Sequence, residues 1–118
     1  CLNVVTREAG VPHAVLLRAA EPVQGIRAST WGPGLLARAM QVDTRFTGTD
    51  LCGSRLWIAR PAQWSTDRNH LRSTTRIGID YAGVWARRRW RIFDAASPYV
   101  STARRTPGFR KRNIARSV

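Results

Sequence analysis

Two polar side chains stand inside apolar stretches near the start of the sequence. Asn3 interrupts the apolar run at residues 2–6, and Arg18 lies within the apolar run at residues 13–20. A polar group in an apolar strand costs stability unless it finds partners. We therefore expect the Asn3 amide either to face a pocket or to bond to neighbouring backbone. The Arg18 guanidinium should pair with a carboxylate or phosphate, or reach solvent at a strand end. Leu16 lies on the same face as Arg18, so it lines the same pocket or packs in the core.

The sequence offers few candidates for acid–base chemistry. Glu8 stands in a polar turn, Glu21 at a strand end before a proline, and Asp80 beside a short extended segment. Surface turn or cap positions are expected for all three, so the chain is predicted to lack a general base. His13 and His70 are isolated in the sequence.

The two cysteines do not indicate a metal site. Neither Cys1 nor Cys52 has a second cysteine or a histidine at zinc-ligand spacing. We expect both thiols to be reduced and partly buried, as in a cytoplasmic protein. No metal is predicted.

Positive charge dominates the composition. The chain has 20 Lys and Arg residues against 7 Asp and Glu residues, for a net charge of +13, and Lys111 is its only lysine. Such a charge attracts phosphate backbones, although an Arg-rich composition also arises from GC-rich codons. A basic cluster, Arg87-Arg88-Arg89, stands between Trp85 and Trp90. No apolar run approaches the length of a membrane span.

Short elements separated by turn residues are expected along the chain. Residues 2–6 and 13–20 should form a hairpin or adjacent strands across a turn that contains Gly and Pro, and Gly32-Pro33-Gly34 should form a tight connection. The remaining expectations are a helix over 35–42, loops over 43–50 and 63–75, a strand over 55–59, and extended pieces at 76–79 and 91–93.

These elements predict one mixed α/β (α+β) domain over residues 1–101. We expect a curved, mainly antiparallel sheet with short helices packed around it. Residues 102–118 hold six cations, no acid and few large apolar side chains, which is the composition of a disordered basic tail.

Three stretches, in order, resemble the alkyladenine (3-methyladenine) DNA glycosylase family, and together they cover nearly all of residues 1–101. The first pairs Cys1-Leu2-Asn3-Val4 with the run at residues 14–22. The second is the Gly-Pro-Gly before the helix, closing at residues 49–51. The third comprises Arg76-Ile77-Gly78-Ile79, Ala82-Gly83, Trp85-Ala86, Arg91-Ile92-Phe93 and Ser97-Pro98-Tyr99-Val100-Ser101.

The resemblance assigns roles to individual residues. It implies that Asn3 obstructs the exocyclic amino group of guanine in a base-binding pocket. It further implies that Arg18 and the backbone carbonyl of Ile77 flank the catalytic water. Trp85 should lie in the core, because the family keeps an aromatic residue there.

The chain also departs from the family pattern. Only the second half of the family domain is matched. The catalytic glutamate and the base-stacking aromatic residues of the family fall before Cys1, so this chain alone is expected to be inactive. Leu35 stands where the family usually has lysine, which puts a phosphate contact there in doubt.

The function implied by the resemblance is base-excision repair. A damaged base is flipped out of duplex DNA, and the N-glycosidic bond of an alkylated or deaminated purine is hydrolysed without a metal or organic cofactor. Duplex DNA with damaged purines would be the partner of a monomeric, cytoplasmic, nucleoid-associated protein. The DNA backbone would be held by Arg87, Arg88, Arg89, Arg104 and Arg105. The alternatives are an Arg-rich nucleic-acid-binding module without chemistry and the remnant of a broken gene.

Overall fold

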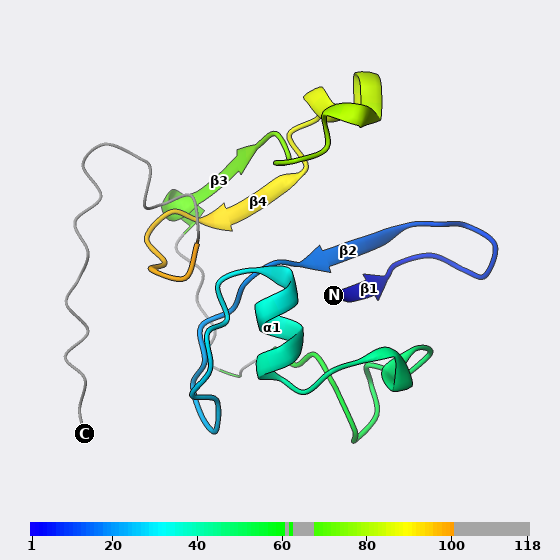
Figure 1. The fold of residues 1–118 in the computed structure, drawn as a ribbon, viewed down its shortest axis with the longest axis vertical. Helices are drawn as coiled ribbons and strands as arrows, with labels where there is room; N and C mark the ends of the chain where they lie inside the picture. Colours follow the sequence, from blue (N-terminus) through cyan, green and yellow to red (C-terminus); the bar gives the residue numbers. More distant parts are fainter. Residues whose placement is uncertain (61, 63–67, 101–118) are drawn as a thin grey trace. The chain divides into compact units, whose positions relative to one another are not determined.

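A computed structural model describes residues 1–60, 62 and 68–100 of the chain (Figure 1). The chain divides into two compact units, Cys1–Trp64 (unit 1) and Ser65–Val118 (unit 2). Each unit holds one two-stranded antiparallel sheet, and short helices complete the described residues. The predicted mixed α/β class with antiparallel pairing is therefore confirmed, with two small sheets in place of the single curved sheet that was expected. The predicted tail, 102–118, lies outside the described residues.

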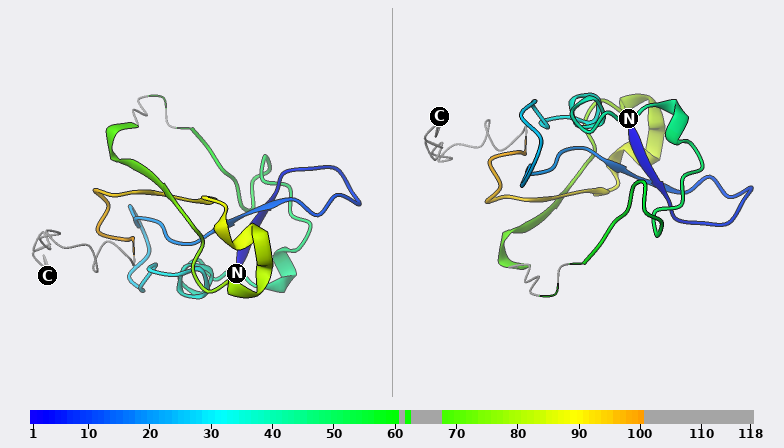
Figure 2. Two further views of the ribbon diagram at one scale, coloured as in Figure 1. Left: turned by 90° about the horizontal axis from the view of Figure 1, so that it is seen from above. Right: turned by 90° about the horizontal axis from the view of Figure 1, so that it is seen from below.

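Unit 1 begins with a β-hairpin. Strands β1 (Leu2–Val5) and β2 (Ala14–Leu17) pair antiparallel, with Leu2 opposite Leu17 and Val5 opposite Ala14. The two strands lie next to each other in Figure 1, and Figure 2 shows the same hairpin from above and from below. Beyond the ladder the Thr6 amide still donates to the His13 carbonyl at 3.1 Å. The antiparallel pairing confirms the predicted hairpin, in which two apolar runs flank a polar turn.

The helix of unit 1 starts and ends earlier than predicted. Helix α1 (Pro33–Ala39) has Pro33 in its first turn, where the missing amide hydrogen costs nothing. It ends because Gln41 adopts a left-handed φ of 56°. The Gln41 amide then donates to the Arg38 carbonyl at 3.0 Å and the Val42 amide to the Ala37 carbonyl at 2.8 Å, a Schellman termination.

The buried residues of unit 1 gather around α1. The helix contacts both strands of the hairpin. Leu36 is 2% exposed and Ala37 is 6% exposed. The loop that enters the helix is tied back by the buried Thr30, whose hydroxyl donates to the Ala20 carbonyl at 2.6 Å.

Replacing Leu36 by alanine should therefore destabilise unit 1 by about 2–5 kcal/mol, since it removes a fully buried side chain and leaves a cavity. Urea unfolding followed by circular dichroism measures the change. Leu35→Ala is the matched control, because the neighbouring Leu35 is 43% exposed and its loss should cost much less. Equal losses for the two variants would contradict the placement of the helix.

The segment after α1 is largely irregular. Its one regular element is the short 3-10 helix η1 (Thr44–Phe46), within the predicted loop 43–50. The strand predicted over residues 55–59 is wrong, since these residues form no ladder and Trp57 and Ile58 are 60% and 59% exposed. The Ile58 amide donates to the Leu51 carbonyl at 3.2 Å, which does not make a strand. A segment with strand-forming side chains becomes a strand only when another strand pairs with it. Among the described residues of unit 1, no strand pairs with residues 55–59.

Unit 2 contains a second antiparallel pair. Strand β3 (Leu71–Thr74) follows the 3-10 turn η2 (Arg68–His70) and pairs with β4 (Arg91–Asp94), with Leu71 opposite Asp94 (Figure 1). Between the strands lies the 3-10 helix η3 (Asp80–Arg87), which is kinked at Gly83, where φ is 55°. The extended piece predicted at 91–93 is confirmed.

Two sequence predictions in unit 2 are wrong. The predicted loop 63–75 contains β3 at residues 71–74, while residues 63–67 lie outside the described residues. The predicted extended piece at 76–79 is a bend, with Gly78 at a φ of 73°. Because this positive φ suits a turn and not a strand, the chain leaves the sheet at this point.

Candidate functional site

The β1–β2 register places two predicted base-binding residues on one face of the hairpin. Asn3 is the direct partner of Leu16 across the ladder, so both side chains project from the same side of the sheet. Asn3 is exposed and Leu16 is half-buried. An amide and an apolar side chain therefore stand next to each other, as a surface that reads the edge and packs on the plane of a base requires.

Arg18 follows the last residue of β2 and is half-buried. Its position two residues beyond Leu16 keeps it near the face that Asn3 and Leu16 share. Within the described residues its guanidinium forms no hydrogen bond or ion pair. Its N–H donors are thus available to a ligand or to solvent.

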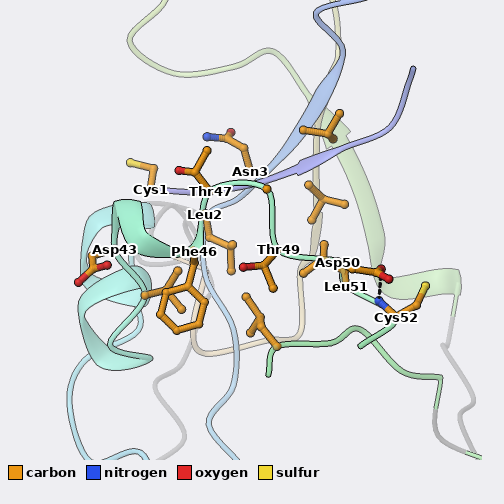
Figure 3. Close-up of a pocket in the computed structure, with 15 residues that line it drawn as sticks. Cys1, Leu2, Asn3, Asp43, Phe46, Thr47, Thr49, Asp50, Leu51 and Cys52 are labelled. Carbon is orange, nitrogen blue, oxygen red and sulfur yellow. Dashed lines mark hydrogen bonds between the residues drawn. The ribbon is translucent and has the colours of Figure 1, made fainter. Parts of the chain in front are cut away.

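A hollow of about 740 Å³ lies beside β1 (Figure 3). Residues 1–5 line one side and residues 42–43 and 46–52 line the other, with Leu56 completing the wall. The Leu2 side chain points toward Phe46 and Thr49, whereas the Asn3 side chain points to the other side of the strand. Asn3 therefore belongs to the rim of the hollow, and the apolar interior is made by the alternate residues of β1.

Two carboxylates at this hollow were not singled out from the sequence, which predicts a loop there. Both act as turn acceptors. Asp43 Oδ1 accepts from the Arg45 amide at 2.9 Å, and Asp50 Oδ1 accepts from the Cys52 amide at 2.8 Å. In turns, an aspartate side chain often accepts a hydrogen bond from the backbone amide two residues later. The sequence could therefore have indicated this role.

The carboxylates whose pKa is shifted are poor proton acceptors. The hydrogen bond from the Arg45 guanidinium lowers the pKa of Asp43, and the hydrogen bond from Arg7 lowers the pKa of Glu8 in the hairpin turn. Efficient general bases have a pKa near the working pH, which calls for an upward shift. The ion pairs therefore move Asp43 and Glu8 away from that role.

Two expectations about burial are wrong. Cys1 and Cys52 are free, as predicted, but both are exposed. Trp85, predicted to lie in the core, is 52% exposed. Cys52 lies on an irregular loop that no element covers, and Trp85 lies on η3, which contains no buried residue.

The basic cluster of unit 2 divides into bound and open arginines. Arg89 donates from Nε and Nη2 to the Ser73 carbonyl, at 3.0 Å for Nε, and so joins the connection before β4 to β3. Arg87 and Arg88 are exposed, and no hydrogen bond or ion pair of their guanidinium groups is found in the part of the chain described. Ile77 lies in the bend after β3 and is 50% exposed. Arg104 and Arg105 lie outside the described residues.

Metal and membrane sites find no support among residues 1–60, 62 and 68–100. No group of three or more His, Cys, Asp or Glu side chains in this part could hold a metal ion. None of its helices is long and apolar enough to cross a membrane.

A sequence model of the methylpurine-DNA glycosylase family matches residues 1–98, and the chain belongs to this family. The match includes Asn3, Leu16, Arg18 and Ile77 and stops before the basic C-terminal residues. The family assigned from the three motifs is therefore confirmed.

Individual bacterial proteins show the same likeness. The chain is 41% identical over 101 residues to a Legionella pneumophila (strain Corby) protein named "Putative 3-methyladenine DNA glycosylase". Proteins with that name from Desulfitobacterium hafniense and an Anaeromyxobacter species are 40% and 43% identical. The matches cover 86%, 86% and 87% of this chain but 54%, 58% and 52% of the relatives. The chain thus spans about half the length of the curated relatives it matches. No solved structure matches it significantly.

Proposed function

We propose that this chain is part of a DNA glycosylase that hydrolyses the N-glycosidic bond of alkylated or deaminated purines in base-excision repair. The family match over residues 1–98 and the names of the relatives support the reaction class. One observation supports the assignment of particular residues to the site. Asn3 pairs with Leu16 across the ladder, and Arg18 lies two positions beyond Leu16.

In this proposal the hairpin supplies part of the base pocket. A base rotated out of the duplex would lie against Leu16, where a half-buried apolar side chain packs on its face. The exposed Asn3 amide next to it would contact the edge of the base. An amide there discriminates among purines because an exocyclic group must either hydrogen-bond with it or clash with it.

Arg18 would contact the attacking water, and its guanidinium would donate a hydrogen bond that orients the water toward the anomeric carbon. The role expected for the backbone carbonyl of Ile77, acceptance of a hydrogen bond from that water, stays a prediction because Ile77 belongs to unit 2. The general base would come from outside residues 1–118, in agreement with the lowered pKa of Asp43 and Glu8. No residue here is assigned to a metal or organic cofactor.

Duplex DNA containing damaged purines is the proposed partner of a monomer located with the nucleoid in the cytoplasm. The net charge of +13 supports phosphate binding by counterion release. Arg87 and Arg88 have open guanidinium groups for this purpose. Arg89 is assigned the same role, although two of its nitrogens donate to Ser73. Arg104 and Arg105, outside the described residues, complete the proposed backbone contacts.

A hybrid protein tests the function. Residues 1–98 would replace the matching part of the Legionella relative, so that the unmatched part of that protein completes the domain. The hybrid should release 3-methyladenine and hypoxanthine from duplex DNA, measured as alkali-sensitive abasic sites. A hybrid that folds and binds DNA but makes no abasic sites would contradict the proposal and favour the non-catalytic nucleic-acid-binding module.

A further inference from the structure

Four side chains of unit 2 form a continuous stack of aromatic rings and guanidinium groups. The rings of Trp85 and Trp90 stack with centroids 5.6 Å apart and an angle of 24° between their planes. The Arg76 guanidinium carbon lies over the Trp90 ring at 5.3 Å, and that of Arg88 lies over the Trp85 ring at 5.6 Å. We name these four residues the tryptophan stack.

The tryptophan stack is held by a stiff backbone frame. Trp85 lies near the end of η3 and Trp90 directly before β4. The amides of Arg88 and Trp90 donate to the carbonyls of Trp85 and Arg88, at 3.3 Å and 2.9 Å. Arg76 Nη2 also donates to the Trp85 carbonyl at 3.1 Å. The rings are therefore ordered before any partner arrives, which lowers the entropic cost of binding.

A second set of bonds fixes the frame to the sheet. The Ser73 hydroxyl donates to the Arg89 carbonyl at 2.5 Å, and the Arg89 guanidinium donates to the Ser73 carbonyl. The link between Trp85 and Trp90 is thus tied to β3 on one side and runs into β4 on the other. A structural role explains Arg89, but it leaves the exposure of the two rings unexplained.

Both rings are unusually open for tryptophan. Trp85 is 52% exposed and Trp90 is 58% exposed. Tryptophan is highly buried on average, and an exposed apolar patch in a stable frame marks an interaction surface. The rim of this patch is cationic, since Arg87 and Arg88 are exposed beside it. An aromatic surface rimmed by arginines is complementary to stacked bases that carry phosphates.

We propose that the tryptophan stack binds single-stranded DNA. An unpaired base takes the place of the Arg88 guanidinium over the Trp85 ring, and the displaced Arg88 and the neighbouring Arg87 then contact the phosphates. Duplex DNA cannot use the ring surface, because its base faces already stack on one another. The choice of DNA rests on membership of a DNA glycosylase family, and the site needs none of the proposed catalytic residues.

Affinity of the whole chain for oligothymidylate tests the proposal. Trp85→Ala and Trp90→Ala should each weaken binding by about tenfold, the loss of one stacked base. The slope of log affinity against log salt should stay unchanged, because a ring neutralises no phosphate. Arg88→Gln should instead lower that slope by about 0.7. Trp57→Ala is the matched control, since Trp57 is 60% exposed in unit 1, and it should bind as the parent chain does.

Two further probes separate stacking from charge. A deoxyribose-phosphate oligomer without bases should bind as weakly as the tryptophan variants bind oligothymidylate. A covalently closed circular duplex, which has no unpaired bases and no exposed end faces, should show no effect of the tryptophan substitutions. Circular dichroism verifies that each variant keeps its fold, and Trp90→Phe, which retains a ring, should recover most of the affinity.

Three outcomes would overturn the proposal. Parent-like binding by both alanine variants would remove the rings from the interface. Equal affinity for the base-free oligomer would make the contact purely electrostatic. An equal loss on closed duplex would assign the surface to double-stranded DNA. None of these outcomes depends on glycosylase activity, so failure of this site and failure of the proposed function are distinguishable.

Discussion

Residues 1–118 alone are expected to form no abasic sites above a no-protein control on DNA that carries hypoxanthine or 3-methyladenine. General-base catalysis contributes about 10²–10⁴-fold, and it requires a carboxylate or imidazole within hydrogen-bond reach of the water. Glu8 is held in an ion pair with Arg7 at 3.0 Å, and Asp43 in one with Arg45 at 2.7 Å. The hybrid with the Legionella relative, assayed in parallel, should be active on the same substrates.

Turnover by the isolated chain would point to a carboxylate at the hollow. Asp50 is then the first residue to test, because it lines the hollow and lacks a salt bridge in the described residues. Asp50→Asn keeps an acceptor for the Cys52 amide and removes the charge. Activity that survives this substitution would transfer the role to Asp43, whose pairing with Arg45 would have to open.

The parts of the fold that local pattern determines could be predicted. The hairpin followed from two apolar runs around a polar turn, and the helix followed from the Gly-Pro-Gly start. Its end could not be placed, since it depends on the left-handed φ of Gln41, a residue type without a strong preference for that conformation.

The parts of the fold that pairing determines were predicted wrongly. Residues 55–59 have strand-forming side chains but no partner among the described residues. Residues 71–74 include an arginine and two hydroxyl residues, yet they form β3 because β4 lies beside them. Arg91 shows how this ladder accommodates a charged side chain: it is 7% exposed, and its Nη1 donates to the Thr74 hydroxyl at 3.2 Å across the ladder. Sheet formation is decided more by neighbours than by intrinsic preference.

The motifs named the members of the candidate site, which stay predictions, whereas their arrangement could be seen only in the structure. The motifs identified Asn3, Leu16 and Arg18, and the register then made Asn3 and Leu16 direct neighbours. The stack of Trp85 on Trp90 could not be foreseen, because it depends on the kink at Gly83 and on the link to Ser73. Ile77 lies in unit 2, so its predicted partnership with Arg18 stays a prediction.

Replacing Arg18 by alanine in the hybrid should reduce single-turnover cleavage by about 10²-fold, the usual cost of misplacing a reacting group. Duplex affinity should change no more than in Arg27→Ala, a matched control at an exposed arginine of the same unit. The reason for the difference is that a group beside the attacking water acts mainly in the transition state, whereas a phosphate contact acts equally before it.

The variant Arg18→Lys and the affinity for duplex DNA decide whether Arg18 contacts the attacking water or a phosphate. Arg18→Lys keeps the charge but loses the planar fork of donors, so it should restore only part of the cleavage rate. Single-turnover rates and affinities are measured on the same damaged duplex. If Arg18→Ala weakens binding and cleavage by the same factor, and lysine restores both, the residue is a simple phosphate contact. Because the Arg18 donors have no partner in the described residues, the substitution breaks no bond of the fold, and a loss confined to the rate identifies chemistry.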